Sequence, residues 1–392
     1  MQELEVGAKV MRPAGNPLKT FLIVLPMLLF SFTLLNRGIK INSDPMQLIP
    51  LVVTYVFLNT LFILMVHTGK VDQYRTILFV TYAICFVLSF IPSLVEVRGS
   101  NMYTPSEIIQ CKIPFCHVVI PMTIIPAILS KTIIFPGSML QGFAAIGSML
   151  AIWLGASLAL GRGFCSWGCF YGGLEDGFSR LPKKPLLKKI DPKWRYFSYA
   201  VLLGVVLTSM ATLTPTYCAW LCPFKTVTEF AKISSVLILI QTIIFVALFV
   251  GLVVILPLLT KKRTQCSFLC PFGALQSFTN KIDAFAIRID PDKCTKCKLC
   301  ISTCPTFSVD EASLARGKAN LSCTKCGKCV AQCPRQAITL AVKGAAHHCQ
   351  KNKISLLFLY PAFTLLLTMG GRFMLDALHR IMLLITTGRM IH

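Results

Sequence analysis

The sequence predicts an all-α polytopic membrane protein of about seven transmembrane helices, joined to a small α+β domain. Two observations predict this class. Of the 392 residues, 55% are hydrophobic and only 14% are charged, whereas soluble domains carry about 25% charged residues. The chain also has 18 cysteines, and most of them are separated by two or three residues, a spacing that is typical of metal ligation.

Long apolar runs predict where the chain crosses a membrane, because a helix needs roughly 20 apolar residues to span the hydrocarbon core. The candidate spans are residues 20–36, 48–67, 76–95, 138–160, 197–217, 234–260 and 354–370. The apolar segment 118–136 contains three prolines and Lys131, so we expect a re-entrant or interfacial segment there. Residues 371–388 mix apolar with ionisable residues, which favours an amphipathic surface helix.

Lysine and arginine in the loops predict the orientation, because these residues are retained on the cytoplasmic side. The loop 161–196 carries eight of them, and the segment 261–353 opens with three in succession. Loops 96–117 and 218–233 carry few and are expected outside. We therefore expect a multi-pass protein of the cell's inner (cytoplasmic) membrane, in contact with membrane lipid.

This organisation divides the chain into three parts. Residues 1–260 are predicted to form a membrane domain with cysteine pairs at helix ends, and residues 354–392 a C-terminal transmembrane helix with an amphipathic tail. Residues 261–353 between them are predicted to form a cytoplasmic domain. This domain is too short to build a large apolar core, so metal ligation is expected to supply much of its stability.

The strongest motif is a repeated C-x2-C-x2-C-x3-C-P run, which occurs at residues 294–305 and again at 323–334. This is the bacterial [4Fe–4S] ferredoxin run, in which the fourth cysteine ligates the other cluster. The predicted ligands are Cys294, Cys297, Cys300 and Cys333 for one cluster, and Cys304, Cys323, Cys326 and Cys329 for the other. The alternative is that these cysteines bind zinc. The presence of two complete copies of the ferredoxin run argues against zinc. Residues 285–340 resemble the two-cluster ferredoxins, so the small domain is expected to be ferredoxin-like.

Three C-x3-C units stand at the ends of apolar spans. Because residues four apart share a helix face, each unit offers two thiolates to one point, and two units on one side of the membrane can share a cluster. Two of the units follow spans that are predicted to end in the cytoplasm. Their cysteines, Cys165, Cys169, Cys266 and Cys270, predict a third cluster at the inner membrane edge.

The remaining unit, Cys218 and Cys222, is predicted on the outer side together with Cys111 and Cys116. These four predict a fourth cluster at the outer edge, with a disulfide or unliganded thiols as alternatives. The sequence therefore predicts three to four [4Fe–4S] clusters.

Three aromatic residues are candidates for cofactor contact. His117 follows Cys116 and is expected to tune the outer cluster, with a surface histidine as the alternative. Trp167 and Trp220 lie inside two of the C-x3-C units. They are expected to shield cluster sulfur from water, and the alternative is anchoring at the membrane interface.

The net charge of +23 does not indicate nucleic-acid binding. The basic residues gather at the ends of apolar spans, as expected for membrane orientation. Each four-thiolate cluster also contributes a charge of about −2, which some of the excess base balances.

C-x3-C units beside membrane spans, followed by a tandem ferredoxin run, resemble a group of polytopic membrane ferredoxins. These proteins accompany periplasmic nitrate reductase and the assembly of nitrous oxide reductase. The resemblance covers residues 138–340, where Cys266, Cys270 and Pro271 match well, Phe170 replaces the proline after Cys169, and the unit at Cys218 is additional. The resemblance implies electron transfer between a membrane quinol pool and a redox partner.

The expected function is to relay electrons between cytoplasmic ferredoxin clusters and the membrane or its outer face, with quinone as a further candidate cofactor. The chain shows no phosphate loop, Ser–His–Asp arrangement or dinucleotide fingerprint, so no substrate site of its own is evident. We therefore expect an electron-transfer component of an oxidoreductase system, acting as a subunit of a larger complex with a redox partner. The alternative is a redox-sensing or assembly protein whose clusters carry no sustained flux.

Overall fold

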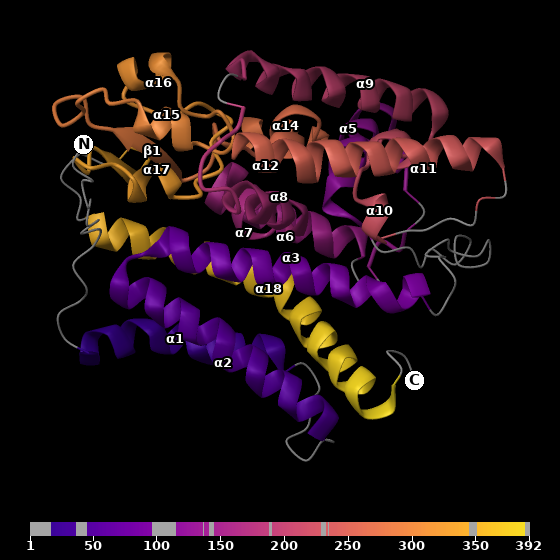
Figure 1. Cartoon of the computed structure of the whole chain (residues 1–392), viewed down its shortest axis with the longest axis horizontal. Helices are drawn as coiled ribbons and strands as arrows, with labels where there is room; N and C mark the ends of the chain where they lie inside the picture. The colour runs from indigo at the N-terminus through magenta and orange to yellow at the C-terminus, as the bar shows by residue number, and fades with distance from the viewer. Residues whose placement is uncertain are drawn as a thin grey trace.

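The computed structural model describes residues 17–36, 45–95, 115–135, 137–140, 145–187, 190–228, 233, 235–344 and 351–388. Of the predicted cluster ligands, Cys111 lies outside this part of the chain. The described residues form a large helical domain and a small ferredoxin-like domain, which lies at the left of Figure 1.

Four long helices form the lower layer of the helical domain in Figure 1. The last of them, α18, packs against the other three. The four are α1 (Pro17–Leu35), α2 (Pro45–Thr68), α3 (Val71–Val95) and α18 (Lys351–Thr387). Close approach of α18 to α3 depends on Gly370, because a Cβ there would lie 2.8 Å from the ring of Tyr82.

The upper layer holds the remaining long helices. They are α6 (Ile146–Leu160), α9 (Phe197–Thr212), and the continuous segment of α11 (Val236–Leu248), η5 (Phe249–Ile255) and α12 (Leu256–Thr260). Short helices fill the space between and beside them. These are η1 (His117–Val119), α5 (Ile120–Ser130), η2 (Gly161–Gly163), α7 (Phe164–Trp167), α8 (Phe170–Arg180), η3 (Pro192–Tyr196), η4 (Tyr217–Leu221), α10 (Lys225–Thr228), α13 (Thr264–Phe268) and α14 (Pro271–Thr279).

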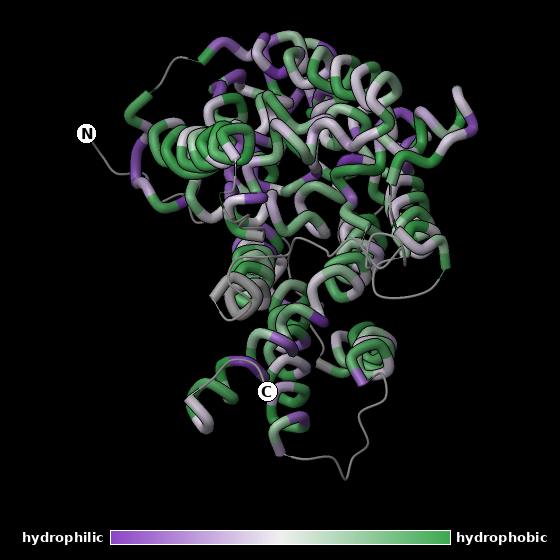
Figure 2. Tube along the Cα trace, turned by 90° about the vertical axis from the view of Figure 1, so that its right-hand side faces the viewer, coloured by the Kyte–Doolittle hydropathy of each residue, from purple (hydrophilic) through white to green (hydrophobic). Residues whose placement is uncertain are grey.

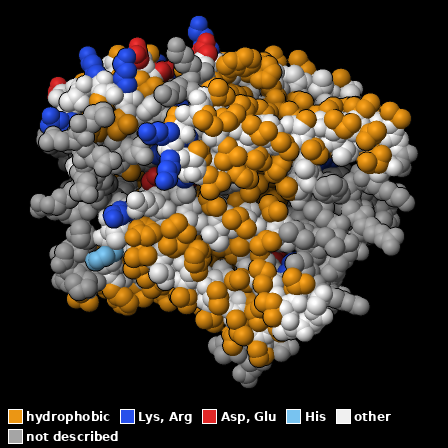
Figure 3. All heavy atoms as spheres, in the orientation of Figure 1, with side chains coloured by type: hydrophobic (Ala, Val, Ile, Leu, Met, Phe, Trp, Pro, Cys, Tyr) orange, Lys and Arg blue, Asp and Glu red, His pale blue; other side chains and the backbone are white. Residues whose placement is uncertain are grey.

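Six helices among the described residues are long and apolar enough to cross a membrane. The span 236–260 is the most apolar, yet only 11% of it is buried inside the protein. A soluble protein rarely exposes so much contiguous apolar surface. Figure 2 shows hydrophobic residues along most of the helical tubes, and Figure 3 shows charged side chains gathered over the ferredoxin-like domain. These features are compatible with a multi-pass membrane protein.

The segment 118–136 contains an 11-residue helix, α5, which is too short to cross a bilayer alone and is compatible with the re-entrant or interfacial segment expected there. The elements differ from the predicted spans at two other positions. The helix expected from residue 138 begins at Ile146. The break expected after residue 370 is absent, because α18 continues for 37 residues. An ion pair of 3.6 Å between Arg372 and Asp376, four residues apart, accommodates these charges within the helix.

Within the segment 261–353, α13 and α14 pack against helices of the helical domain, and β1 (Phe285–Ile289) follows them as the first strand of the ferredoxin-like domain. β1 pairs antiparallel with β2 (Ile338–Val342), and Ile287 faces Leu340 across the pair. The short helices of this domain are α15 (Leu299–Thr303), α16 (Glu311–Ala315) and α17 (Lys328–Ala331). Its core consists of a few aliphatic side chains together with cysteines of both ferredoxin runs.

Candidate metal centres

The first predicted ligand set surrounds one cavity in the ferredoxin-like domain. Cys294, Cys297, Cys300 and Cys333 all line it. The chain bends around this cavity through left-handed residues at Lys296 and Lys298, and the second run repeats that geometry at Lys325 and Gly327.

The second predicted set also lies together. Burial raises the pKa of Cys329, and the nearby thiols of Cys323, Cys326 and Cys304 raise it further. Cys304 belongs to the first run by sequence, and it lies beside the second run in space. Its sulfur accepts a hydrogen bond of 3.2 Å from the backbone N–H of Ser308.

The third set lies inside the helical domain. Burial raises the pKa of Cys270 to about 12, and the thiol of Cys165 beside it adds to the rise. Cys169 lies close to both Cys165 and Cys270, and Cys266 lies close to Cys169 and Cys270. The four cysteines expected to share a cluster are therefore brought together.

The spacing of the C-x3-C units suggested that each unit lies on one helix, but the structure shows that none does. In each unit the second cysteine is extended and joins two short segments. Cys169 precedes α8 with ψ 106°, Cys270 precedes α14 with ψ 113°, and Cys222 follows η4 with ψ 104°. This break turns the second thiol toward the first without requiring a continuous helix face.

Two buried arginines hold the third set in a reciprocal arrangement. Arg162 donates to the carbonyl of Cys266 at 3.1 Å, and Arg263 donates to the carbonyl of Cys165 at 2.7 Å. Each arginine precedes the first cysteine of its own unit by three residues. Arg263 also lies 3.3 Å from the sulfur of Cys266. The pattern R-x2-C-x3-C could have identified both residues, but the sequence reasoning passed over it.

These arginines indicate a negatively charged group at the third set. Arg162 and Arg263 are 3% and 0% exposed, and neither forms an ion pair within 4 Å among the described residues. Glu175 and Asp176 lie close enough to Arg263 to compensate part of its charge. Because burying an uncompensated cation costs several kcal/mol, a further anion suits a site that also holds Arg162. A four-thiolate [4Fe–4S] cluster supplies one, so the residues present fit that group.

Glu175 positions Cys266 from α8. Its carboxylate accepts the backbone N–H groups of Gln265 at 2.6 Å and of Cys266 at 3.0 Å. Burial raises the pKa of Glu175 to about 7, although Arg263 and these hydrogen bonds oppose the rise. Sequence reasoning did not find Glu175, since a lone acidic residue in a helix carries no motif.

The three described members of the fourth predicted set, Cys116, Cys218 and Cys222, lie close together. Burial raises the pKa of Tyr171, and the thiols of Cys116, Cys222 and Cys218 raise it further. The sulfur of Cys116 lies 3.9 Å from the hydroxyl of Tyr171. Three of the four predicted ligands therefore surround one side chain.

The third and fourth sets adjoin each other instead of lying at opposite membrane edges. Tyr217, next to Cys218, accepts a hydrogen bond of 2.7 Å from Gln265, next to Cys266. The reason is that the chain folds back after the span 236–260, so that the hydroxyl of Thr264 donates to the carbonyl of Leu252 at 2.5 Å. Leu252 lies eight residues before the end of the segment 236–260, and a helix rises 1.5 Å per residue. The residues after Thr264, including Cys266, therefore lie beside the helix and not beyond its end.

His117 contacts a different set from the one expected. Its Nε2 lies 3.2 Å from the sulfur of Cys169, whereas it was expected to tune the set that contains Cys116. The ring is 1% exposed, so the surface alternative is excluded. His117 thus lies between the third and fourth sets.

The two tryptophans differ in their surroundings. Trp167 is 1% exposed and Trp220 is 37% exposed, so only Trp167 is placed to exclude water. The indole N–H of Trp167 has no hydrogen-bond partner within the described chain. Since buried donors are normally paired, this N–H suits an acceptor such as cluster sulfide.

Within the described residues, no three His, Cys, Asp or Glu side chains converge closely enough to hold a single metal ion.

Comparison with known proteins supports this chemistry. Residues 286–334 match the family model of a 4Fe-4S dicluster domain. A second model, a 4Fe-4S binding domain, matches three times, at residues 141–189, 194–239 and 242–289. Each of these three repeats contains one C-x3-C unit, so the unit at Cys218 belongs to the same repeating pattern as the other two.

The chain is also similar to an uncharacterized protein of Methanocaldococcus jannaschii. The two are 28% identical over 153 residues, which is 37% of this chain and 52% of that protein. The chain thus spans about half the length of the curated relative that it matches. No solved structure matches the chain.

The fold and the cysteine sets define an iron–sulfur protein built from ferredoxin-type [4Fe–4S] domains. Domains of this type imply an electron carrier.

Proposed function

We propose that this protein is a membrane-bound electron carrier whose four cysteine sets hold a continuous series of [4Fe–4S] clusters. The observation that carries the proposal is that each set adjoins the next, from the ferredoxin-like domain into the helical domain. A cluster bound at each set would accept and donate single electrons. The protein's role is to hold the clusters close together and to set their potentials through burial and hydrogen bonds.

The second and third sets are linked by direct contacts. Asn280 donates to the carbonyls of Leu321 and Cys323 at 2.7 and 2.8 Å, and accepts from the backbone N–H of Arg162 at 2.8 Å. The backbone N–H of Arg263 donates to the carbonyl of Pro305 at 2.8 Å. One layer of residues therefore separates the two ferredoxin runs from the arginines of the third set.

The third and fourth sets are linked by His117, Tyr171 and the contact between Tyr217 and Gln265 described above. Gln241 on α11 donates to the carbonyl of Ala219 at 3.2 Å, inside the unit of the fourth set. Because α11 is apolar and largely exposed, we place the fourth set next to lipid. There, a quinone in the bilayer could exchange electrons with it, as the resemblance to membrane ferredoxins implies.

We place the ferredoxin-like domain on the cytoplasmic side, where it would meet a redox partner. Cys297 is exposed, and four cations surround its cavity, namely Lys293, Lys296, Lys298 and Arg335. A positive rim around an exposed cluster favours association with an acidic partner surface. The protein would then act as one subunit of a larger redox complex.

The test uses protein purified anaerobically and reconstituted in liposomes whose bilayer contains a quinone and which enclose an oxidised dye that quinol can reduce. A reduced donor is added outside. We expect about sixteen iron atoms per chain, four per cluster, and reduction of the enclosed dye. The variant Cys218→Ser should abolish dye reduction, lose about four irons and keep the ferredoxin signals in electron paramagnetic resonance.

Cys85→Ser is the matched control, because Cys85 lies in α3 outside all four sets and should behave like the wild type. Dye reduction that survives in Cys218→Ser would remove the fourth set from the path. A count near twelve irons in the wild type would leave three clusters.

A further inference from the structure

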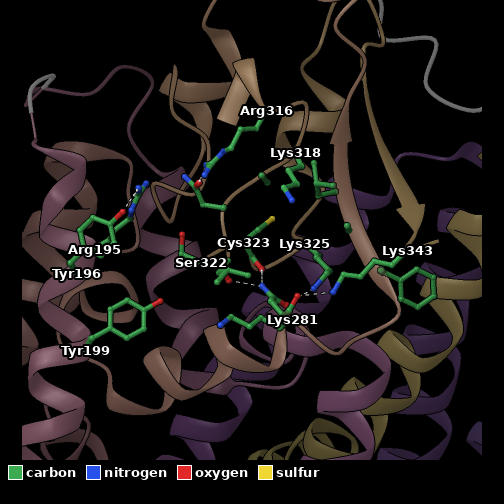
Figure 4. Close-up of a pocket in the computed structure, with 17 residues that line it drawn as sticks. Arg195, Tyr196, Tyr199, Lys281, Arg316, Lys318, Ser322, Cys323, Lys325 and Lys343 are labelled. Atoms are coloured by element: carbon green, nitrogen blue, oxygen red, sulfur yellow. Dashed lines mark hydrogen bonds between the residues drawn. The ribbon is translucent and has the colours of Figure 1, made fainter. Parts of the chain in front are cut away.

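A second basic cavity lies where the ferredoxin-like domain meets the start of α9 (Figure 4). Tyr196 and Tyr199 form one wall, Phe285 and Ile287 of β1 contribute to another, and Cys323 of the second set also lines it. The cavity is separate from that of the first set, since no residue lines both.

Six cations line this cavity and no carboxylate does. They are Arg195, Lys281, Arg316, Lys318, Lys325 and Lys343. Figure 4 shows Lys325 and Lys343 side by side beneath Cys323, with Lys318 and Arg316 above it. The cations come from η3, from the residues just after α14, from the loop before the second run, from the second run itself and from the residue after β2, so the tertiary fold assembles them.

Two of the cations are held in place by a buried carboxylate. Asp283 is 2% exposed, pairs with Lys325 at 2.7 Å and also contacts Lys343. Lys343 also donates to the carbonyl of Asn280 at 2.6 Å. One carboxylate thus serves two lysines, so it leaves positive charge uncompensated.

The cations at the rim differ in their partners. Arg195 pairs with Asp310 at 3.0 Å and Arg316 contacts Asn320. The side chains of Lys281 and Lys318 have no hydrogen-bond or ion-pair partner among the described residues, and both are exposed. A cluster at the second set accounts for the buried Lys325 next to Cys323. The cluster does not account for the cations at the mouth of the cavity, because solvent screens the interaction between these exposed charges and the cluster.

We propose that this cavity binds a phosphate group. Several cations that converge on a concave site with no competing carboxylate match the charge of a phosphate. A concave site walled by aromatic rings favours a small molecule or headgroup over a flat protein surface. The same phosphate chemistry is offered by a soluble phosphorylated compound and by an anionic phospholipid, because the apolar helix α9 begins at the cavity wall.

A phosphate bound there would act on the second cluster, and this part rests on the proposed function. An added negative charge beside Cys323 disfavours reduction, so the reduction potential of that cluster falls when the site is filled. The site would therefore couple ligand binding to electron flow out of the ferredoxin-like domain.

The test measures binding directly on the holoprotein. Equilibrium dialysis with radiolabelled inorganic phosphate covers the soluble source. Native mass spectrometry of protein from nanodiscs of mixed phosphatidylglycerol and phosphatidylcholine covers the lipid source. The double variant Lys281→Gln/Lys318→Gln should weaken binding at least about tenfold, because each lost charged contact is worth about a factor of ten.

Lys184→Gln is the control, an exposed lysine that does not line the cavity. Phosphate binding in the wild type and control that fails in the double variant supports a soluble ligand. If the wild type and the control retain phosphatidylglycerol and the double variant loses it, the ligand is a lipid headgroup. Equal behaviour of the double variant and the control with both probes would overturn the inference.

A redox titration of the same samples separates the two proposals. If the iron count and cluster signals are intact while neither probe binds, only the phosphate site fails. If the clusters themselves are missing, the proposed function fails first. With the site intact, a saturating probe lowers the midpoint potential of one ferredoxin cluster in the wild type and leaves it unchanged in the double variant.

Discussion

Single residues around the third set explain why two of the three C-x3-C units pair with each other. Gly172 and Gly273 each lie three residues after the second cysteine of their unit, and each leaves room for an arginine of the other unit. A Cβ at Gly172 would collide with the guanidinium of Arg263, and one at Gly273 would lie 3.2 Å from that of Arg162. The unit at Cys218 has Pro215 and Lys225 at these positions, so it cannot join the reciprocal pair.

Gly172→Ala should therefore disrupt the third set. The new methyl group displaces Arg263, which leaves a buried cation misplaced beside the ligands. We expect a loss of about four irons per chain, measured by iron and sulfide analysis. Gly204→Ala is the control, since a Cβ there meets nothing within 4 Å on α9. Full iron content in Gly172→Ala would contradict the reciprocal packing.

His117 offers a second prediction at this scale. When Cys169 ligates a cluster as a thiolate, its sulfur can only accept, so Nε2–H of His117 donates to it and stabilises the more negative, reduced cluster. His117→Leu should lower the potential of that cluster by an amount on the order of 50 mV, because 59 mV corresponds to about 1.4 kcal/mol for one electron. A titration followed by electron paramagnetic resonance measures this shift.

His67→Leu provides the comparison, since His67 ends α2 and is exposed. If His117→Leu and His67→Leu give the same potentials, His117 does not tune this cluster.

Among the elements, the packing of α3 against α8 depends on a buried ion network. Arg75 lies 3.0 Å from Asp176 and 3.3 Å from Asp72, and Arg180 closes the network at 2.7 Å from Asp72. Arg75 also donates to the carbonyl of Ser166 at 3.1 Å, between two cysteines of the third set. Although burial alone would raise it, Arg75 and Arg180 hold the pKa of Asp176 well below its usual range.

Arg75→Leu should destabilise the helical domain by about 3–5 kcal/mol, because it removes the fully buried cation and leaves two buried carboxylates to share Arg180, which is partly exposed. Arg372→Leu removes an exposed pair on α18 and should cost less than about 1 kcal/mol. Thermal unfolding of both variants in the same detergent compares them. If the two variants lose similar amounts of stability, the buried network stabilises the protein no more than the exposed pair does.

For the whole molecule, the ferredoxin-like domain depends on its clusters more than the helical domain does. Its core contains cysteines from both runs beside few aliphatic side chains, so cluster ligation replaces apolar burial. The helical domain has an extensive core of its own, built from α2, α3 and α18 among others.

Removal of iron with a chelator under anaerobic conditions should unfold residues 285–344 and leave most of the helical signal in circular dichroism. Limited proteolysis followed by mass spectrometry should then find cuts within this range before any within α3 or α18. Reconstitution with iron and sulfide serves as the control and should restore resistance. Unchanged resistance after iron removal would show that the domain folds without clusters.

The sequence by itself determined the chemistry of this protein. The spacing of the two runs predicted which eight cysteines gather in the ferredoxin-like domain, including the exchange of Cys304 and Cys333. The three C-x3-C units and the apolar spans predicted the other sets and the helical architecture. Local spacing predicts this much because each motif carries several thiolates close together in the chain, and because the two runs are copies of one pattern.

Only the tertiary structure decided how the sets lie relative to one another. The end of an apolar span does not reveal that the chain then folds back, as it does where Thr264 meets Leu252, so the third and fourth sets were expected at opposite edges. The same folding assembles the buried arginines, Glu175 and the cations around Cys323 from distant segments. The pattern R-x2-C-x3-C marks the two arginines, but it does not reveal which groups they contact. Those contacts depend on packing between elements.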